Sequence, residues 1–143
     1  MLFAEEGAHV MCADIDAEGA ATTADAIGDA AVAMQVNVAD PAACEAMTTA
    51  TVETFGGIDA VYANAGVAGS GRAGDLDVDE WNRVIGITLT GVWLSITYAS
   101  PHLSAAGGGA LILPSRVGGI IGVPGMAAYA AAKAGVSALT KQM

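Results

Sequence analysis

The chain has 143 residues, 54% of them hydrophobic, and a formal net charge of −10 at pH 7. This length supplies one domain with a core, and an acidic chain without a basic patch is a poor nucleic-acid binder. No apolar run reaches the roughly 20 residues that cross a membrane, so we expect neither nucleic acid nor membrane as a partner. The N-terminus carries acidic residues early and no basic segment, which predicts a cytoplasmic protein without a secretory signal.

The charge is distributed unevenly along the chain. All 15 acidic residues lie at or before Glu80, with only Arg72 to oppose them, whereas four basic residues and no acidic one follow. A part so poor in charge is predicted to be buried, in a core or in an interface. Cys12 and Cys44 lack metal-ligand spacing, which predicts reduced structural thiols and no metal site.

Helix and strand patterns alternate along the chain. The chain begins with the tail of a helix (1–6) that stops at Gly7. We then predict four strands, at 9–13, 30–36, 58–63 and 110–114, and two loops, a Gly-rich one at 67–78 and another at 115–125. The predicted helices are 17–27, capped by Asp16; 41–55, begun by Asp40-Pro41; a long helix 80–104, capped by Asp79; and a last helix from about 126. Continuously apolar strands alternating with helices predict a parallel sheet covered on both faces, in one domain.

In such sheets, ligands bind outside the carboxyl ends of the strands. The polar or small residues at those ends are Asp14, Asn37, Asn64-Ala65-Gly66 and Ser115-Arg116, which we expect to form a single site together with the last helix. A carboxylate at Asp14 can accept both hydroxyls of an adenosine ribose and would repel a 2′-phosphate, which favours NAD over NADP.

Each of these residues also has a plainer interpretation. Asn37-Val38 could hold an adenine edge, yet Asn is a common turn former and Asp14 could equally be a turn aspartate. Gly66 lies where the backbone must approach something closely, and tight packing alone would explain it.

The last helix carries Tyr129 and Lys133, four residues apart and therefore on one face. A nearby positive charge favours the phenolate form of a tyrosine. Tyr129 could then give or take a proton at a substrate oxygen. The same pair taken alone is also a common half-exposed surface pair.

Together these residues resemble the short-chain dehydrogenase/reductase family. Four features follow in the family's order. An Asp ends a strand (Asp14), and Asn-Val stands at 37–38 where the family usually has Asp-Val. YANAG at 62–66 corresponds to the family NNAG, and YAAAK at 129–133 to the family YxxxK; the segments GVWLS and GGIIGVPGMAAYAAAKAG also resemble the family. The resemblance implies a Rossmann-type fold, bound NAD(P), and hydride transfer between nicotinamide and an alcohol or ketone.

The family resemblance also assigns roles. Tyr129 would be the acid/base, and Lys133 would favour its phenolate and hold the nicotinamide ribose. Asp14, Asn37, Val38, Asn64, Ala65 and Gly66 would complete the cofactor site. The long helix and the tyrosine-bearing helix often pair across a dimer or tetramer in this family, so a homo-oligomer is expected.

The chain departs from the family pattern at both ends and at two site positions. The family's opening strand and its TGxxxGxG loop, which seats the pyrophosphate, have no counterpart here, nor have its later strands. The resemblance therefore implies one partial dinucleotide-binding domain over 1–143, in which the neighbours of the family's central strand each lack a pairing partner. The family serine, 13 residues before the tyrosine, corresponds to Arg116, and the family asparagine to Thr88. Ser115 is adjacent, but neighbouring residues in a strand point to opposite faces.

Three interpretations remain open at this stage. The first is an oxidoreductase of this family. The second is a non-catalytic relative that keeps only a helical oligomer interface, and the third is an unrelated flavodoxin-like binding domain, which predicts flavin colour in the purified protein.

Overall fold

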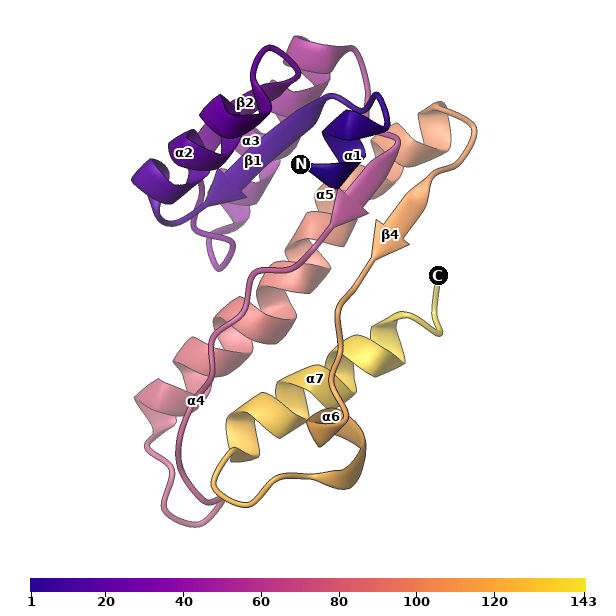
Figure 1. The fold of residues 1–143 in the computed structure, drawn as a ribbon. Coiled ribbons are helices and arrows are strands. Elements are labelled where there is room, and N and C mark those ends of the chain that lie inside the picture. Colours follow the sequence, from indigo (N-terminus) through magenta and orange to yellow (C-terminus); the bar gives the residue numbers. More distant parts are fainter.

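The computed structural model describes residues 1–143 and contains two pairs of parallel strands (Figure 1). In the first pair, β1 (Val10–Asp14) lies beside β2 (Ala31–Gln35); in the second, β3 (Ala60–Tyr62) lies beside β4 (Ala110–Ile112). No strand joins the two pairs. The α/β fold with parallel strands is therefore confirmed, as is the expectation that strands on either side of a gap each lack one partner.

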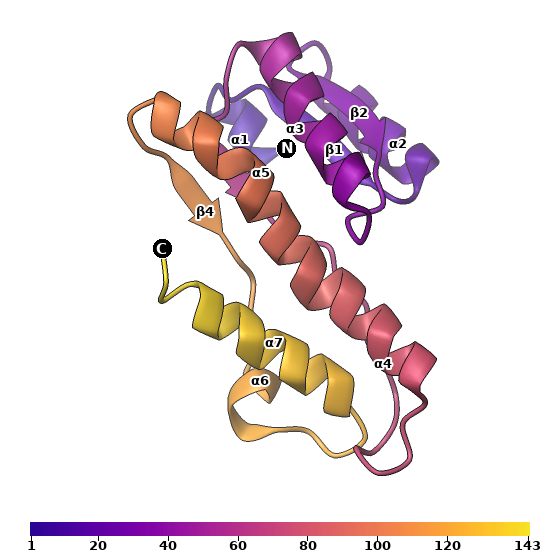
Figure 2. The same ribbon diagram turned by 180° about the vertical axis from the view of Figure 1, so that it is seen from behind.

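The first helix lies over the space between the two strand pairs. In both views α1 (Leu2–Glu5) lies between the pair β1–β2 and the pair β3–β4 (Figures 1 and 2). Gly7 follows it with a positive φ of 94°, which ends the helix where the sequence predicts.

Helices α2 (Ala17–Ile27) and α3 (Pro41–Phe55) have the bounds that the sequence predicts. Each begins at an aspartate whose carboxylate accepts a hydrogen bond from a first-turn N–H, which satisfies one of the free donors at the helix start. Asp16 accepts from Glu18 at 3.1 Å, and Asp40 from Ala42 at 2.9 Å. α2 packs on β1 and β2, and α3 packs on α5.

The long helix comprises α4 (Val78–Ile85), a π-helical turn η1 (Gly86–Thr90) and α5 (Gly91–Ala105). Its cap is Asp77, not Asp79 as predicted, because Asp77 is the extended residue whose side chain accepts from the Asp79 N–H at 3.2 Å. Asp79 instead lies in the first turn, where a negative charge complements the helix dipole.

The segment Val78–Ala105 is long and apolar enough to cross a membrane by length and composition. A core helix of a folded domain meets the same criteria. Here the segment packs against α3, α7 (Ala127–Leu139) and β3, so it is the central helix of this fold. Its outer face still exposes two large aromatic side chains, Trp81 and Trp93.

A short helix, α6 (Gly118–Ile121), lies within the predicted loop 115–125 and was not expected. It packs directly on α7, since a Cβ at Gly119 would lie 2.7 Å from the Lys133 carbonyl carbon. Such close approach of two backbones requires a glycine. Only this tertiary contact, which the local sequence does not reveal, fixes the turn.

The core surrounds α5. One cluster joins Ala63, Val92, Ile96 and Val136, and a second joins Ile58, Ala99 and Leu103. The apolar side chains of β3 and β4 pack onto these clusters, whereas no residue within the four strands is fully buried. The long helix and α7, rather than a continuous sheet, therefore supply most of the buried surface, and α7 is also the helix that carries the candidate acid/base.

Candidate active site

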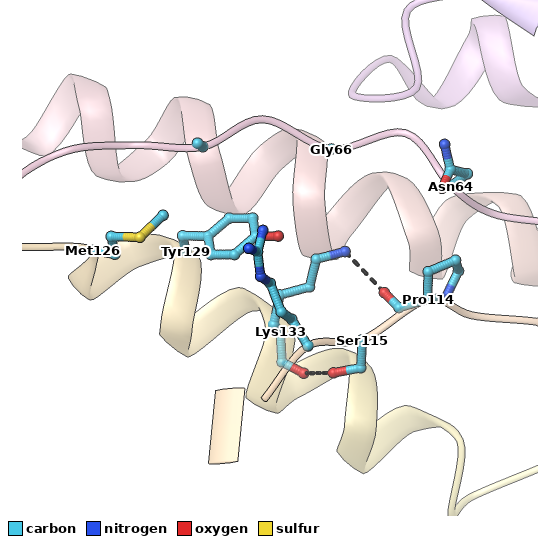
Figure 3. Close-up of a pocket in the computed structure, with 9 residues that line it drawn as sticks. Asn64, Gly66, Pro114, Ser115, Met126, Tyr129 and Lys133 are labelled. Carbon is cyan, nitrogen blue, oxygen red and sulfur yellow. Dashed lines mark hydrogen bonds between the residues drawn. The ribbon is translucent and has the colours of Figure 1, made fainter. Parts of the chain in front are cut away.

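A cleft of about 320 Å³ lies where three segments meet (Figure 3). The segment after β3 contributes Asn64, Gly66 and Ala68; the segment after β4 contributes Pro114, Ser115 and Arg116; and the start of α7 contributes Met126, Tyr129 and Lys133. Two of these segments follow parallel strands, so the cleft lies at the carboxyl end of that strand pair, as the sequence predicts.

The tyrosine–lysine pair lines this cleft from α7. Lys133 is only 7% exposed, and its Nζ donates a hydrogen bond of 2.8 Å to the Pro114 carbonyl oxygen (Figure 3). The same Nζ lies 5.8 Å from the centre of the half-buried Tyr129 ring. The spacing of four has therefore placed a positive charge beside a phenol, as predicted, although their catalytic roles stay predictions.

Burial of the Lys133 ammonium is only partly compensated within the protein. A buried ammonium is costly unless its hydrogens are bonded, and the Pro114 carbonyl takes one of the three. The other two are free to bond a ligand oxygen in the cleft. The hydrogen bond to Pro114 also connects α7 to the segment after β4, which holds two walls of the cleft together.

Ser115 is not directed at the tyrosine. Its hydroxyl donates to the Lys133 backbone carbonyl at 2.8 Å (Figure 3). It also lies 2.7 Å from the Ser137 hydroxyl, one turn further along α7. Ser115 therefore anchors the segment after β4 to α7 and does not take the place of the family serine. Arg116, at the position of that serine, is exposed and lines the cleft.

Thr88 binds the backbone of a distant loop residue, a contact that the sequence does not predict. It lies in the π-helical turn and is fully buried, and its hydroxyl accepts from the Val67 N–H at 3.0 Å and donates to the Val67 carbonyl at 3.2 Å. One hydroxyl thus satisfies both backbone groups of a loop residue. Thr88 holds the segment after β3 in place, and it does not line the cleft itself.

The structure separates the predicted cofactor residues into two groups. Asn64 and Gly66 line the cleft beside Tyr129 and Lys133, and Ala65 lies between them in the chain without lining it. The other group does not line this cleft and lies on the strand pair β1–β2, which is not joined to the pair β3–β4. Whether the two groups serve one extended ligand stays a prediction.

The second group lies at the ends of β1 and β2. The Asp14 carboxylate accepts from the Asp16 N–H at 3.0 Å, and the Asn37 side-chain oxygen accepts from the Ala39 N–H at 3.1 Å. Both side chains are exposed and stabilise their own turns, and each keeps oxygen lone pairs available for a ligand. Val38 packs on Gly91 of α5, where a Cβ would lie 2.7 Å from its methyl group.

Sequence reasoning missed part of the cleft wall. Ala68 and Pro114 carry no chemical signal, and only the structure shows that the loop 67–78 reaches the start of α7. There the Gly71 N–H donates to the Gly125 carbonyl at 2.8 Å, and the Ala127 N–H donates to the Gly71 carbonyl at 3.2 Å. Ser137 could have been found from its spacing of four from Lys133.

The cysteines lie outside this cleft. Burial raises the pKa of the Cys44 thiol, and the negative charge of Asp40 raises it further; burial likewise raises the pKa of the Cys12 thiol. Cys44 donates to the Val38 carbonyl at 3.3 Å, which is a packing role for a protonated thiol.

Known dehydrogenases and reductases resemble the chain in sequence. A family model described as enoyl-(acyl carrier protein) reductase matches residues 1–143. Cyclohexanol dehydrogenase of Acinetobacter sp. (strain SE19) is 37% identical over 99% of this chain and 58% of its own length. Cis-4-hydroxycyclohexanecarboxylate dehydrogenase of Sinomonas cyclohexanicum is 42% identical over 98% of this chain and 57% of its own length.

A solved structure agrees with these relatives. The crystal structure described as a short-chain alcohol dehydrogenase from Sinorhizobium meliloti 1021 superposes with a TM-score of 0.91 at 31% identity, covering 97% of this chain and 56% of the other. The chain thus spans little more than half the length of the relatives it matches. A family match over the whole chain, together with this shared fold, decides the assignment: the chain belongs to the short-chain dehydrogenase/reductase family.

Proposed function

We propose that the protein is an NAD-dependent oxidoreductase that transfers a hydride between the nicotinamide and a small secondary alcohol or its ketone. The observation that carries this proposal is the pairing of Tyr129 with the buried Lys133 on one face of α7, inside a single cleft. The dehydrogenase relatives support the reaction type.

Bound NAD would supply the hydride acceptor. Tyr129 then performs the proton transfer: its phenolate takes the hydroxyl proton of the alcohol as the carbon loses its hydride, and the phenol returns that proton in the reverse direction. The Pro114 carbonyl holds the Lys133 ammonium close to the ring, where its charge can stabilise the negative charge that develops on the phenol oxygen during the transfer. In this role Tyr129 is the acid/base and Lys133 is its electrostatic partner.

The residues of this chain fit the two ends of a dinucleotide. The free Lys133 hydrogens suit the hydroxyls of the nicotinamide ribose, with Asn64 and Gly66 on the opposite wall of the cleft. At the other end, the exposed Asp14 carboxylate suits the adenosine ribose hydroxyls and disfavours a 2′-phosphate. NAD is thus the cofactor we propose, rather than NADP.

The starts of α2, α3 and α4 do not suit the pyrophosphate between those ends. α2, α3 and α4 are each capped by an aspartate carboxylate, which occupies a first-turn N–H and would repel an anion: Asp16, Asp40 and Asp77. The candidate residues of this chain therefore serve the two ribose ends of the dinucleotide and not its pyrophosphate.

The cleft suits a small ring alcohol. Its volume is at the low end of the range for ligand sites, which is roughly 300–1,000 Å³, and Ala68, Pro114 and Met126 supply apolar surface. The named substrates of the two relatives are alcohols on a cyclohexane ring. We therefore include a cyclic secondary alcohol as the substrate class in this proposal.

A second candidate function is association through the long helix without catalysis. It is favoured by the outer face of that helix, where Trp81 is 40% and Trp93 49% exposed. Burial of such large aromatic side chains is a strong driving force for association. In this proposal two or four copies pair along the helix, and Trp93→Ser should return the protein to monomers in size-exclusion chromatography with light scattering.

The test of the enzyme proposal is oxidation of cyclohexanol with NAD, followed by NADH absorbance. Tyr129→Phe should lower the rate by about 10²–10⁴-fold, because it removes only the hydroxyl that moves the proton. Tyr98→Phe on α5, outside the cleft, is the matched control and should keep the rate. An undiminished rate in Tyr129→Phe contradicts the acid/base assignment, and no oxidation by the unaltered chain favours the second candidate.

Cofactor binding is tested separately from turnover. NADH should raise the midpoint of thermal unfolding measured by circular dichroism, because a ligand stabilises the state that binds it. Asp14→Ala should reduce this shift, whereas Asp29→Ala, in the turn before β2, should leave it unchanged. An identical shift in both variants would contradict the role of Asp14.

A further inference from the structure

Arg116 stands out among the residues that line the cleft. The position of the family's serine holds a cation here, and the neighbouring Ser115 is occupied by its bonds to the Lys133 carbonyl and Ser137. No serine hydroxyl is therefore available beside Tyr129. The group that the chain presents in its place is a guanidinium, which carries a fixed positive charge and five N–H donors.

The guanidinium has no partner within the protein. The single salt bridge of the chain joins Arg83 to Glu80, and the buried Lys133 is bonded to Pro114. Arg116 takes part in none of the side-chain hydrogen bonds of the structure and is exposed at the cleft. Its N–H groups are therefore available to bind a ligand in the cleft.

The electrostatics of the cleft favour an anion. Two of the nine lining residues are cationic and none is acidic, although the whole chain carries −10. The residue that precedes α7, Met126, also lines the cleft, and no side chain caps that end of the helix, so its positive dipole end adds to the field. A substrate with a negative group should therefore bind more tightly than a neutral one.

We infer that the substrate carries a carboxylate, which Arg116 binds while the substrate hydroxyl meets Tyr129. This inference rests on the proposed function, because it concerns the alcohol that Tyr129 deprotonates. A guanidinium and a carboxylate form two parallel hydrogen bonds, which fix orientation as well as position. The ring between the two polar groups lies against Met126 and Pro114. Arg116 is thus a specificity-determining residue, and the substrate class is a ring hydroxy acid or its keto acid.

The inference is tested by binding, without turnover. The probes are 4-hydroxycyclohexanecarboxylate and the neutral 4-hydroxycyclohexanecarboxamide, titrated into the purified chain and followed by ligand-detected NMR. The carboxylate should bind at least about tenfold more tightly than the amide, and added salt should reduce the difference because a partly exposed ion pair is screened.

The variants decide which residue is responsible. Arg116→Gln should bring the two affinities to within about twofold, and Arg116→Lys should restore part of the preference, since it returns the charge without the paired donors. Lys141→Gln, which removes the same charge from the exposed C-terminal turn, is the control and should keep the preference. Circular dichroism melts of each variant show whether it is folded.

Equal affinity for the two probes, no saturable binding of the carboxylate, or a preference that survives in Arg116→Gln overturns the inference. These outcomes are separate from failure of the proposed function. Loss of cyclohexanol oxidation in Tyr129→Phe together with a preference unaffected by Arg116→Gln would keep the enzyme and remove only its carboxylated substrate.

Discussion

Residues 1–57 and 58–143 each contain one parallel strand pair, but they are built differently. The first region has ten acidic residues and no Lys or Arg, whereas the second has five of each sign. Of the 21 buried residues, five lie in the first region and 16 in the second. Those five are small or polar: Ala20, Ala24, Val36, Cys44 and Thr48.

This difference assigns separate tasks to the two regions. The second region holds both core clusters and the Tyr129–Lys133 cleft, so its own packing fixes the proposed catalytic groups. The first region carries Asp14 and Asn37 on a thin, uniformly negative unit whose charges repel one another. It reaches the second region through the contact of α3 with α5 and of Val38 with Gly91. We therefore expect stability to reside in residues 58–143.

The largest loss of folding free energy should come from truncating a core side chain in the second region, residues 58–143. Leu103→Ala removes a buried side chain from the cluster with Ile58 and Ala99, which typically costs about 2–5 kcal/mol. Val32→Ala, on the outer face of β2 where the side chain is 39% exposed, should cost well under 1 kcal/mol. Urea unfolding of both variants measures the difference, and equal losses would contradict the division between the regions.

The next effect concerns the link between the long helix and the cleft. Thr88→Val keeps the shape of the side chain and removes the hydroxyl that satisfies both backbone groups of Val67. An unsatisfied buried group costs about 1–3 kcal/mol. Thr97→Val, an exposed threonine bonded only to the Trp93 carbonyl on its own helix, should change stability by less than about 0.5 kcal/mol. If the two variants unfold alike, Thr88 has no clamping role.

These effects also show which parts of the structure local sequence determines. Helices 17–27 and 41–55 could be predicted to the residue because an aspartate cap and a terminal glycine are local signals. α6 could not be predicted, since only the contact of Gly119 with the backbone of α7 explains it. The start at Asp77 was missed because two aspartates lie within three residues and the extended backbone selects one.

In the candidate site, too, some features follow from local sequence and others depend on contacts between distant residues. A spacing of four on one helix was enough to place Tyr129 and Lys133 together, because helix geometry fixes that relation. The direction of Ser115 depends on Ser137 and the Lys133 carbonyl, which lie 22 and 18 residues further along the chain. The separation of Asp14 from the cleft depends on how two strand pairs are arranged, which no short pattern contains.

A smaller effect is expected at the contact between the regions. Gly91→Ala would improve helix propensity by about 1 kcal/mol, yet its Cβ would lie 2.7 Å from a Val38 methyl and 3.1 Å from the Val38 carbonyl oxygen. Overpacking costs about 1–3 kcal/mol, so we expect a net loss near 1 kcal/mol. Hydrogen exchange should accelerate in β1 and β2 and remain unchanged in α7.

The matched control for this contact is Gly86→Ala. Its Cβ would meet only the Ala39 Cβ at 3.9 Å, an ordinary contact, and the gain in helix propensity should then show as a stabilisation. Uniform acceleration of exchange in Gly91→Ala, including α7, would mean that the two regions unfold as one unit.

The smallest effect should lie at the loop 67–78, on the surface of the second region. The side-chain hydrogen bond from Arg83 holds the pKa of Glu80 below its ordinary value, and Arg83 also donates to the Ala68 carbonyl of this loop at 3.2 Å. A lowered pKa in the folded state means that the carboxylate stabilises the fold above the ordinary glutamate range, and that this contribution disappears as the pH falls through the lowered value. The free energies of unfolding of the unaltered chain and of Glu80→Gln should therefore differ slightly at pH 7 and converge below about pH 4.

Since the Glu80–Arg83 pair is exposed, added salt should also reduce this difference in unfolding free energy. Glu45→Gln, on the exposed face of α3, should show no such convergence, and a pH-independent gap between Glu80→Gln and the unaltered chain would mean that the loop does not depend on this charge.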